Sequence, residues 1–256
     1  MSDPKITGRE EWLTARRELL AKEKELTRHR DEVNAARRRL PMVEVTKDYT
    51  FEGPDGKLSL GDLFDGRSQL IVYHTMFDVD DDACCPACSM WMDNVGDMTH
   101  LHARDTTLVF VSIAPLEKLD RFQKRMGWNL PWFSSHGSMF NYDYHATFDP
   151  EIAPVEWNYK SYDELLKDSP DWEGFTGSES GASAFLRTDD GIFHTYSCYG
   201  RGIELLNPTF SWLDLTARGR QEDFEEPPGR SDGGSMEWLR LKDEYDPAVI
   251  GGAKNT

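Results

Sequence analysis

Two runs of consecutive apolar residues organise the middle of the chain. Residues 69–76 contain the run LIVY, and residues 107–113 repeat the pattern with LVFV. Such runs are typical of strands that are buried on both faces of a sheet. A helical pattern follows each of them, at 86–103 and at 115–126, and Gly127 is the expected end of the second helix. This order predicts parallel strands joined by right-handed crossovers.

Two hairpins add antiparallel strands to this parallel pair. Residues 49–51 and 57–59 flank the turn sequence GPDG, and residues 184–187 and 192–196 flank TDDG. Strand-forming residues on either side of such turns predict β-hairpins. The expected fold is therefore α/β, with a central mixed sheet flanked by helices.

The first forty residues have a different periodicity. Thr7 and Glu10 form the pattern of a capping box, and the helix that follows is expected to end before Pro41. Apolar residues recur in it every seven positions, at Trp12, Leu19, Leu26, Val33 and Leu40. Such a narrow stripe does not make an isolated helix stable, so the helix needs a docking surface. That surface is either its own domain or a second copy of the chain, which would form a homodimer through residues 8–40.

Composition shifts divide the chain into three parts. We expect an N-terminal helical arm at 1–40, an α/β domain at 41–219 and an acidic C-terminal tail at 220–256. The domain is interrupted at 149–181 by Pro150, Pro154 and Pro170 together with several Gly and Ser residues, which predicts a surface insertion with one helical turn near residues 163–166. In the tail, the amphipathic segment 236–245 predicts a short helix that packs back through Trp238 and Leu241.

Charge narrows the choice of partners. The chain has 29 Lys and Arg against 46 Asp and Glu, a net charge of −17. This negative net charge repels phosphate backbones and anionic lipid headgroups, so neither nucleic acid nor a membrane is an expected partner. The arm is the exception, because residues 9–40 carry about three net positive charges. With no apolar stretch of membrane-spanning length and no signal-like start, the expected location is the cytoplasm.

Three of the four cysteines lie together at Cys84, Cys85 and Cys88. A C-x-x-C pair that opens a helix gains from the unpaired N–H groups and partial positive charge there, which lower the pKa of a thiol. Pro86 suits the first helical turn because it has no N–H to leave unpaired. We assign Cys85 as the nucleophile and Cys88 as the resolving thiol, with Cys84 as a competing attacking sulfur. Carboxylates just upstream oppose this activation, at Asp78, Asp80, Asp81 and Asp82.

Metal binding is the alternative use of a cysteine cluster. A structural zinc ion takes four ligands, and the candidates that could complete such a set are His74, His194 and Cys198. His74 is more typical of a hydrogen-bonded core residue, and Cys198 of a small buried apolar residue. No metal site and no cofactor are therefore predicted, and zinc binding stays an alternative.

A second alternative is a binding protein without catalysis. Aromatic residues between positions 128 and 144 could line a ligand pocket, although side chains of this kind more often form core: Trp128, Trp132, Phe133, Phe140, Tyr142 and Tyr144. In this interpretation the fold is kept, the N-terminal helix forms the dimer, and a small ligand binds near the aromatic run.

Several segments of the chain resemble a bacterial family of thioredoxin-like proteins of unassigned function, described as predicted dithiol-disulfide oxidoreductases. The similar segments are "ARRELLAKEKELTRHRDEV", "DLFDGRSQLIVYHTMF", "CPACS", "RMGWNLPWFSS", "FNYDY" and "GIFHTYSCYGRG", between residues 11 and 216. The resemblance implies a thioredoxin-like fold over 41–219 and places Cys85 and Cys88 at the active turn. It implies no particular activity.

The sequence departs from thioredoxins at three places. The segment 180–183 has no proline where thioredoxins carry a cis-proline opposite the cysteines, and Cys84 stands where a tryptophan usually precedes the dithiol. The threonine that peroxiredoxins place before their reactive cysteine is also absent. The absent threonine disfavours peroxide reduction. Because the cysteine turn lies between a buried strand and a helix, the leading hypothesis is a thiol-disulfide oxidoreductase acting on an unidentified thiol or disulfide substrate.

Overall fold

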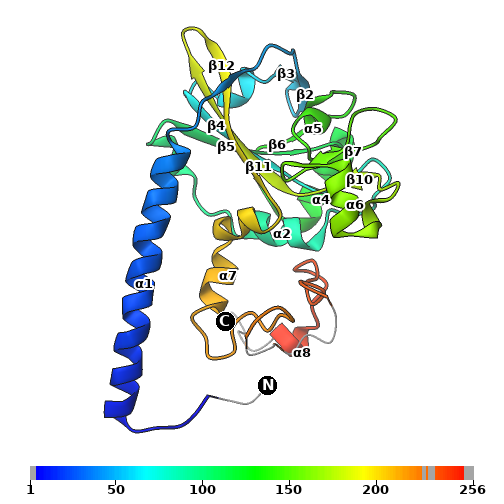
Figure 1. Cartoon of the computed structure of the whole chain (residues 1–256). Helices are drawn as coiled ribbons and strands as arrows, with labels where there is room; N and C mark the ends of the chain where they lie inside the picture. The colour runs from blue at the N-terminus through cyan, green and yellow to red at the C-terminus, as the bar shows by residue number, and fades with distance from the viewer. Residues whose placement is uncertain (1–3, 227–228, 230–233, 251–256) are drawn as a thin grey trace.

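A mixed sheet of eight strands forms the centre of the protein (Figure 1). The structure is a computed structural model and describes residues 4–226, 229 and 234–250. The strand order is β1-β12-β11-β4-β5-β6-β2-β3. The strands of this sheet are β1 (Val43–Glu44), β2 (Thr50–Gly53), β3 (Gly56–Ser59), β4 (Gln69–His74), β5 (Thr106–Ser112), β6 (Trp132–Ser134), β11 (Gly181–Thr188) and β12 (Gly191–Tyr199).

Helices and short strand pairs surround this sheet. The α-helices are α1 (Arg9–Arg37), α2 (Pro86–Asp93), α3 (Thr99–His102), α4 (Leu116–Met126), α5 (Phe140–Asp143), α6 (Tyr162–Asp168), α7 (Pro208–Leu213) and α8 (Pro247–Ile250). The 3-10 helices are η1 (Asp62–Phe64), η2 (Pro170–Trp172) and η3 (Gly200–Leu206). Two separate strand pairs join β7 (Thr147–Phe148) to β10 (Gly177–Ser178) and β8 (Glu156–Trp157) to β9 (Lys160–Ser161).

The strand directions are those of a thioredoxin-like fold. β4 pairs in parallel with β5, and β5 in parallel with β6. β11 is antiparallel to β4 on its other side and forms a hairpin with β12. The expected α/β fold with a central mixed sheet is confirmed, as are both hairpins. None of the described helices combines the length and the apolar character needed to cross a membrane.

Successive residues of the central strands supply two cores, one on each face of the sheet. Leu70 and Val72 of β4 belong to one cluster with Phe64 of η1 and Phe140 of α5. Tyr73 of β4 points to the other cluster, whose helical members come from α2, α4 and α7: Cys88, Trp91, Met92, Leu119, Phe122, Met126 and Phe210. The aromatic run after residue 128 therefore contributes mainly to the cores, since Trp132, Phe140 and Tyr144 are buried.

Helix α1 stands away from the sheet (Figure 1) and has no buried residue among the 29 that form it. Gly8 occupies its N-cap position without a side-chain cap, and the hydroxyl of Thr7 hydrogen-bonds to Glu11. The capping box predicted at Thr7 and Glu10 is therefore wrong, although the long helix itself forms. At the other end the guanidinium of Arg37 lies 4.6 Å from the ring centre of Tyr196 on β12, which ties the helix to the sheet.

The helix expected over 86–103 is instead two helices, α2 and α3. The side-chain amide of Asn94 donates to the carbonyl of Met90 at 2.7 Å and ends the first helix. After Gly96, the carboxylate of Asp97 accepts from the N–H of Thr99 at 2.7 Å and starts the second. Local side-chain hydrogen bonds of this kind compete with helix continuation.

The insertion is more structured than the expected single turn. It contains helix α6, and its side chains form a small core with Phe148, Val155 and Leu165 at the centre. Ser161 and Glu164 make a capping box at the start of α6. Aromatic contacts, such as Trp172 to Phe148 with ring centres 5.5 Å apart, make this core possible despite the high content of Pro and Gly.

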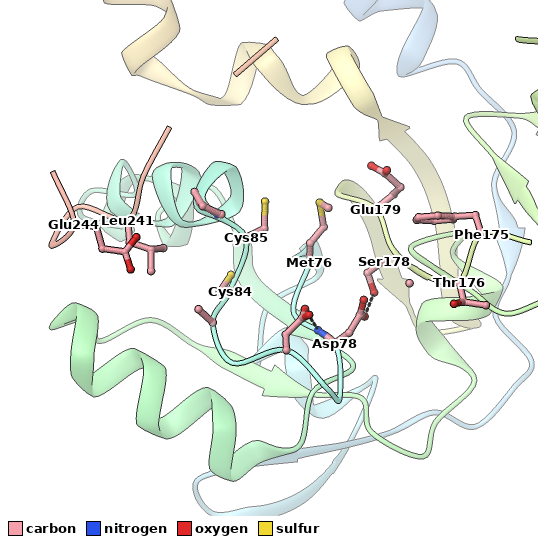
Figure 2. Close-up of a pocket in the computed structure, with 14 residues that line it drawn as sticks. Met76, Asp78, Cys84, Cys85, Phe175, Thr176, Ser178, Glu179, Leu241 and Glu244 are labelled. Atoms are coloured by element: carbon pink, nitrogen blue, oxygen red, sulfur yellow. Dashed lines mark hydrogen bonds between the residues drawn. The ribbon is translucent and has the colours of Figure 1, made fainter. Parts of the chain in front are cut away.

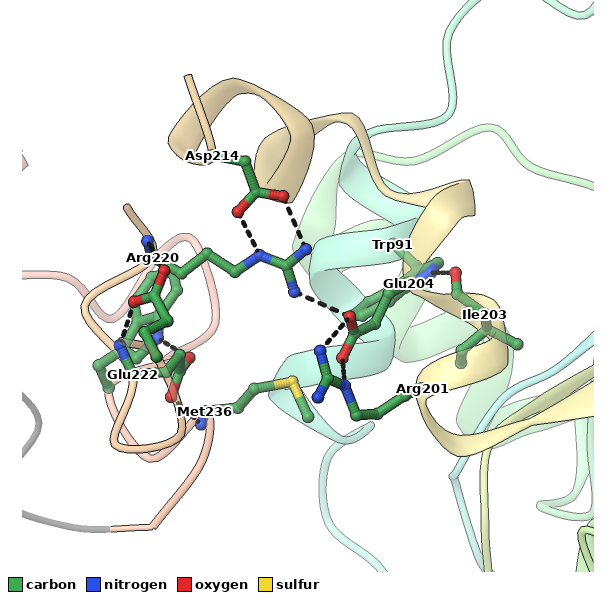
Figure 3. A network of polar contacts seen from close by, with 10 residues as sticks. Trp91, Arg201, Ile203, Glu204, Asp214, Arg220, Glu222 and Met236 are labelled. Carbon is green, nitrogen blue, oxygen red and sulfur yellow. Dashed lines mark hydrogen bonds and ion pairs between the residues drawn. The ribbon is translucent and has the colours of Figure 1, made fainter. Parts of the chain in front are cut away.

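The tail packs back on the domain, but without the helix expected over 236–245. Arg220 forms ion pairs with Asp214 at 2.7 Å and with Glu204 at 2.9 Å (Figure 3). The buried carboxylate of Glu222 accepts from the indole N–H of Trp238 at 2.7 Å. Leu241 is 2% exposed, as its predicted docking requires, whereas Trp238 is 37% exposed. The described helix of the tail, α8, lies further on.

Candidate functional site

Strand β4 leads directly into the cysteine turn. After the strand, the N–H of Cys85 donates to the carbonyl of Met76 at 3.1 Å, and the N–H of Met76 donates to Sγ of Cys88 at 3.4 Å. These two hydrogen bonds fold the loop against the start of α2. Cys85 is the N-cap residue of α2, and Pro86 occupies the first turn. The sequence-based expectation of a dithiol at a helix start agrees with this geometry.

The three clustered cysteines differ in exposure. Cys85 is half-buried, while Cys84 and Cys88 are each 1% exposed. All four cysteines of the chain are free thiols. Cys85 is thus the sulfur of the cluster that a molecule from solution can reach.

The environment of Cys85 favours its thiolate. A hydrogen bond from the thiol of Cys88 is the largest influence and, with the N–H groups of Cys88 and Ala87, lowers the pKa of Cys85 to about 6. Burial opposes this, and the carboxylate of Asp81 adds a smaller opposing effect. The acidic loop upstream therefore weakens the activation of Cys85 without reversing it.

The neighbouring thiols are held in the neutral form. The hydrogen bond to Cys85 and burial raise the pKa of Cys88 well above its usual range. Tyr73 contacts the same sulfur, with its hydroxyl 3.8 Å from Sγ of Cys88. Burial also raises the pKa of Cys84, so this sulfur lacks both the exposure and the ionisation that an attacking group needs.

A pocket of about 490 Å³ opens beside Cys85 (Figure 2). Its walls come from the loop before α2, from residues 175–179 at the end of the insertion, and from Leu241 and Glu244 of the tail. Apolar contact surface is supplied by Met76, Phe175 and Leu241. Three segments that are distant in the sequence thus enclose one reactive sulfur.

Glu179 is a pocket residue that the sequence analysis missed. It precedes β11 and lies on the wall of the pocket that faces Cys85 (Figure 2). Burial, and then the negative charge of Cys85, raise the pKa of Glu179 to about 7. The sequence did offer a signal for Glu179, since it lies just before the segment that replaces the cis-proline of thioredoxins, and that proline lies opposite the cysteines.

Both histidines among the candidate zinc ligands form hydrogen bonds with serine hydroxyls. His74 is buried, and its Nε2 is 2.8 Å from Oγ of Ser183, while Nε2 of His194 is 2.7 Å from Oγ of Ser197. The two serine hydroxyls are 2.8 Å apart, so a hydrogen-bonded chain joins the two imidazoles. Cys198 is half-buried. The described residues contain no group of three or more His, Cys, Asp or Glu that could hold a metal ion.

Comparison with known proteins assigns the chain to a family. A family model described as a bacterial protein of unknown function (DUF899) matches residues 1–245. The chain belongs to this family. No curated protein matches it. Membership in DUF899 leaves the chemistry of the cysteine turn to be argued from the residues themselves.

Among solved structures, the DUF899 chain is similar to proteins named as peroxiredoxins. A mutant of Xylella fastidiosa PrxQ has a TM-score of 0.41 and 13% identity, and the match covers 68% of this chain and 95% of that one. For the peroxidoxin BcpB of Mycobacterium tuberculosis the TM-score is 0.43 and the identity 11%, with 66% and 95% covered. For Xanthomonas campestris peroxiredoxin Q these values are 0.42 and 13%, with 70% and 98% covered. Similarity at this level carries no information on activity.

Proposed function

We propose that this DUF899 protein is a cytoplasmic thiol-disulfide oxidoreductase in which Cys85 attacks and Cys88 resolves. The observation that carries this proposal is the asymmetry of the pair. The accessible sulfur has a pKa of about 6, and the buried sulfur beside it has a raised pKa and hydrogen-bonds to it. A thiolate is the nucleophile in disulfide exchange, so only the first sulfur is ready to attack at neutral pH.

The proposed reaction is a two-electron reduction of a disulfide. The thiolate of Cys85 forms a bond to one substrate sulfur, and the other substrate sulfur leaves as a thiolate and takes up a proton. Cys88 then loses its proton and attacks Sγ of Cys85, which releases the second substrate thiol and leaves a Cys85–Cys88 disulfide. A dithiol reductant restores the two thiols by the reverse exchange.

The contacts of Cys88 support its role in the second step. In the thiolate form it would accept from the N–H of Met76, which is already 3.4 Å away, and from the hydroxyl of Tyr73. Once Cys85 is bonded to substrate it no longer carries a charge, so the largest cause of the raised pKa of Cys88 is removed. Formation of the mixed disulfide therefore prepares the resolving thiol.

The test is equilibration of the protein with mixtures of oxidised and reduced dithiothreitol, followed by acid quenching and mass analysis after thiol labelling. We expect loss of two labelled thiols and a peptide that links Cys85 to Cys88. With bis(2-hydroxyethyl) disulfide as the oxidant, whose mixed disulfide has no second thiol that could release the protein, Cys88→Ser is expected to retain a mixed disulfide at Cys85. Cys198→Ser serves as the matched control that behaves like wild type. If no mixture produces the link between Cys85 and Cys88, the proposed function is wrong.

Helix α1 favours a second candidate role, in assembly. The heptad residues of the arm are exposed to between 43% and 67%, four of them on α1 and Leu40 just after its end: Trp12, Leu19, Leu26, Val33 and Leu40. A second apolar surface lies near α7, where Trp212 is 70% and Leu215 is 78% exposed. We propose that α1 docks on a second copy of the chain, because its arm is basic and the rest of the chain is acidic.

Light scattering tests this assembly. Wild type is expected to be a dimer and a variant without residues 1–40 a monomer. The double variant Leu19→Glu with Leu26→Glu is also expected to be a monomer, since it charges the apolar stripe. Ala21→Glu with Thr27→Glu adds the same charge to other exposed positions of α1 and should leave the dimer intact. A monomeric wild type would remove this candidate role.

A further inference from the structure

The pocket beside Cys85 has a strongly one-sided charge. Four carboxylates are among its lining residues, at Asp78, Asp81, Glu179 and Glu244, and none of the described residues that line it is Lys, Arg or His. A disulfide that reaches Cys85 must enter this field. When Cys85 is ionised, its thiolate adds one more negative charge at the point of reaction.

Among the residues that the structure describes, one of the four carboxylates is neutralised by an ion pair. Glu244 lies 2.8 Å from Arg125, which also pairs with Asp243. The partners of the others are uncharged. Asp78 accepts from the hydroxyl of Ser178, and Asp81 accepts from the N–H of Asp78 at 2.8 Å.

One cation contacts the same loop. The ammonium of Lys118 donates to the backbone carbonyls of Val79 and Asp81. It offsets one of the three uncompensated carboxylates, at Asp78, Asp81 and Glu179. The local field therefore stays negative, in line with the net charge of the whole chain.

A field of this sign acts on the encounter with substrate and on the transition state. Disulfides with carboxylates near the sulfurs are repelled, and those with amines or guanidinium groups are attracted, with energies that grow as burial lowers the effective dielectric constant. Resting on the proposed oxidoreductase function, we infer that the site selects disulfides flanked by positive charge and discriminates against anionic ones such as oxidised glutathione. The apolar side chains of Met76, Phe175 and Leu241 then contact the neutral part of the substrate.

Three small disulfides of similar size separate charge from shape. Cystamine carries two amines, bis(2-hydroxyethyl) disulfide is neutral, and dithiodipropionate carries two carboxylates. The rate at which each oxidises the Cys85–Cys88 pair is divided by its rate with free dithiothreitol, which removes intrinsic reactivity. The assay runs at pH 8, because Glu179 has a pKa of about 7 and is then ionised.

At low ionic strength we expect the normalised rate for cystamine to exceed that for dithiodipropionate by roughly tenfold or more. In 1 M salt the Debye length falls to about 3 Å, so the ratio should approach one. The normalised rate for the neutral bis(2-hydroxyethyl) disulfide should lie between the rates for the two charged disulfides.

Variants locate the effect. The triple change Asp78→Asn, Asp81→Asn and Glu179→Gln is expected to reduce the ratio severalfold. The double change Asp81→Asn with Glu179→Gln tests the same point without altering the half-buried Asp78. The matched control removes three charges from hairpin turns far along the sheet from this pocket, as Asp55→Asn, Asp189→Asn and Asp190→Asn.

Equal normalised rates for the three disulfides would overturn this selectivity and leave the oxidoreductase function intact. A control variant that lowers the ratio as much as the pocket variant would also overturn it, because the net charge of the chain would then be the cause. Failure of all three disulfides to oxidise the pair would refute the oxidoreductase function, and the selectivity with it.

Discussion

Replacing Cys88 by alanine tests the main cause of Cys85 activation. The pKa of Cys85 is about 6, whereas an unperturbed cysteine has a pKa of about 8.5. This difference corresponds to about 3 kcal/mol in favour of the thiolate. At pH 7 it changes the ionised fraction from about 3% to about 90%. The hydrogen bond from Cys88 is the largest contribution, so its loss should raise the pKa of Cys85 by at least about one unit.

The assay follows thiolate formation by ultraviolet absorbance and by the pH dependence of iodoacetamide alkylation, with mass mapping to identify the modified cysteine. Cys88→Ser keeps a hydroxyl donor and should give an intermediate pKa, while Cys198→Ser should match wild type. A Cys88→Ala protein that still titrates near pH 6 would refute the assignment. The N–H groups at the start of α2 would then be the dominant cause.

Three further predictions concern the surroundings of the site. Because Glu179 and Cys85 interact, we expect the titration of Cys85 in wild type to be broader than that of a single site, and Glu179→Gln should narrow it; equal breadth in the two proteins would contradict this. Burial lowers the pKa of His74 to about 3, so unfolding takes up a proton between that pH and about 6.5, and stability falls as pH falls through this window. Between pH 7 and pH 4, the free energy of unfolding measured by urea denaturation should therefore fall by roughly 3 kcal/mol more in wild type than in His74→Asn. Equal losses would argue against a neutral buried imidazole. Leu241→Ala should lower the free energy of unfolding by about 2–5 kcal/mol and increase the rate of alkylation of Cys85. Leu205→Ala, at a 75% exposed position, should leave both quantities unchanged.

The parts of the fold that could be predicted from sequence are those set by local pattern. The apolar runs gave β4 and β5, and Pro115 with Gly127 bounded α4, because Gly127 adopts φ of 66° at the C-cap. The break between α2 and α3 was missed although Gly96 and Asp97 mark it. Their effect depends on hydrogen bonds of individual side chains, which an average over helical periodicity does not register.

The candidate site was predictable only where the chain is continuous. The position of Cys85 at a helix start follows from its neighbours in sequence. Glu179 reaches it because β11 pairs with β4 in a register that sets Gly181 opposite His74. Leu241 reaches it because the tail folds back, which no local pattern in the segment 236–245 specified. Both contacts join segments that are distant in the sequence, so the pocket and its charge could not be predicted from local sequence patterns.

The return of the tail to the reactive sulfur has a consequence for preparation of the protein. Loss of the chain after residue 226 would remove Leu241 and Glu244 from the wall of the pocket while leaving every described strand pairing untouched. The shortened molecule would keep its sheet, and with it the circular dichroism of the folded protein, but Cys85 would be more exposed to solvent. The substrate range measured on such material would be broader than that of the intact chain. The mass of the purified protein should therefore be determined, because loss of the tail during purification would otherwise go unnoticed.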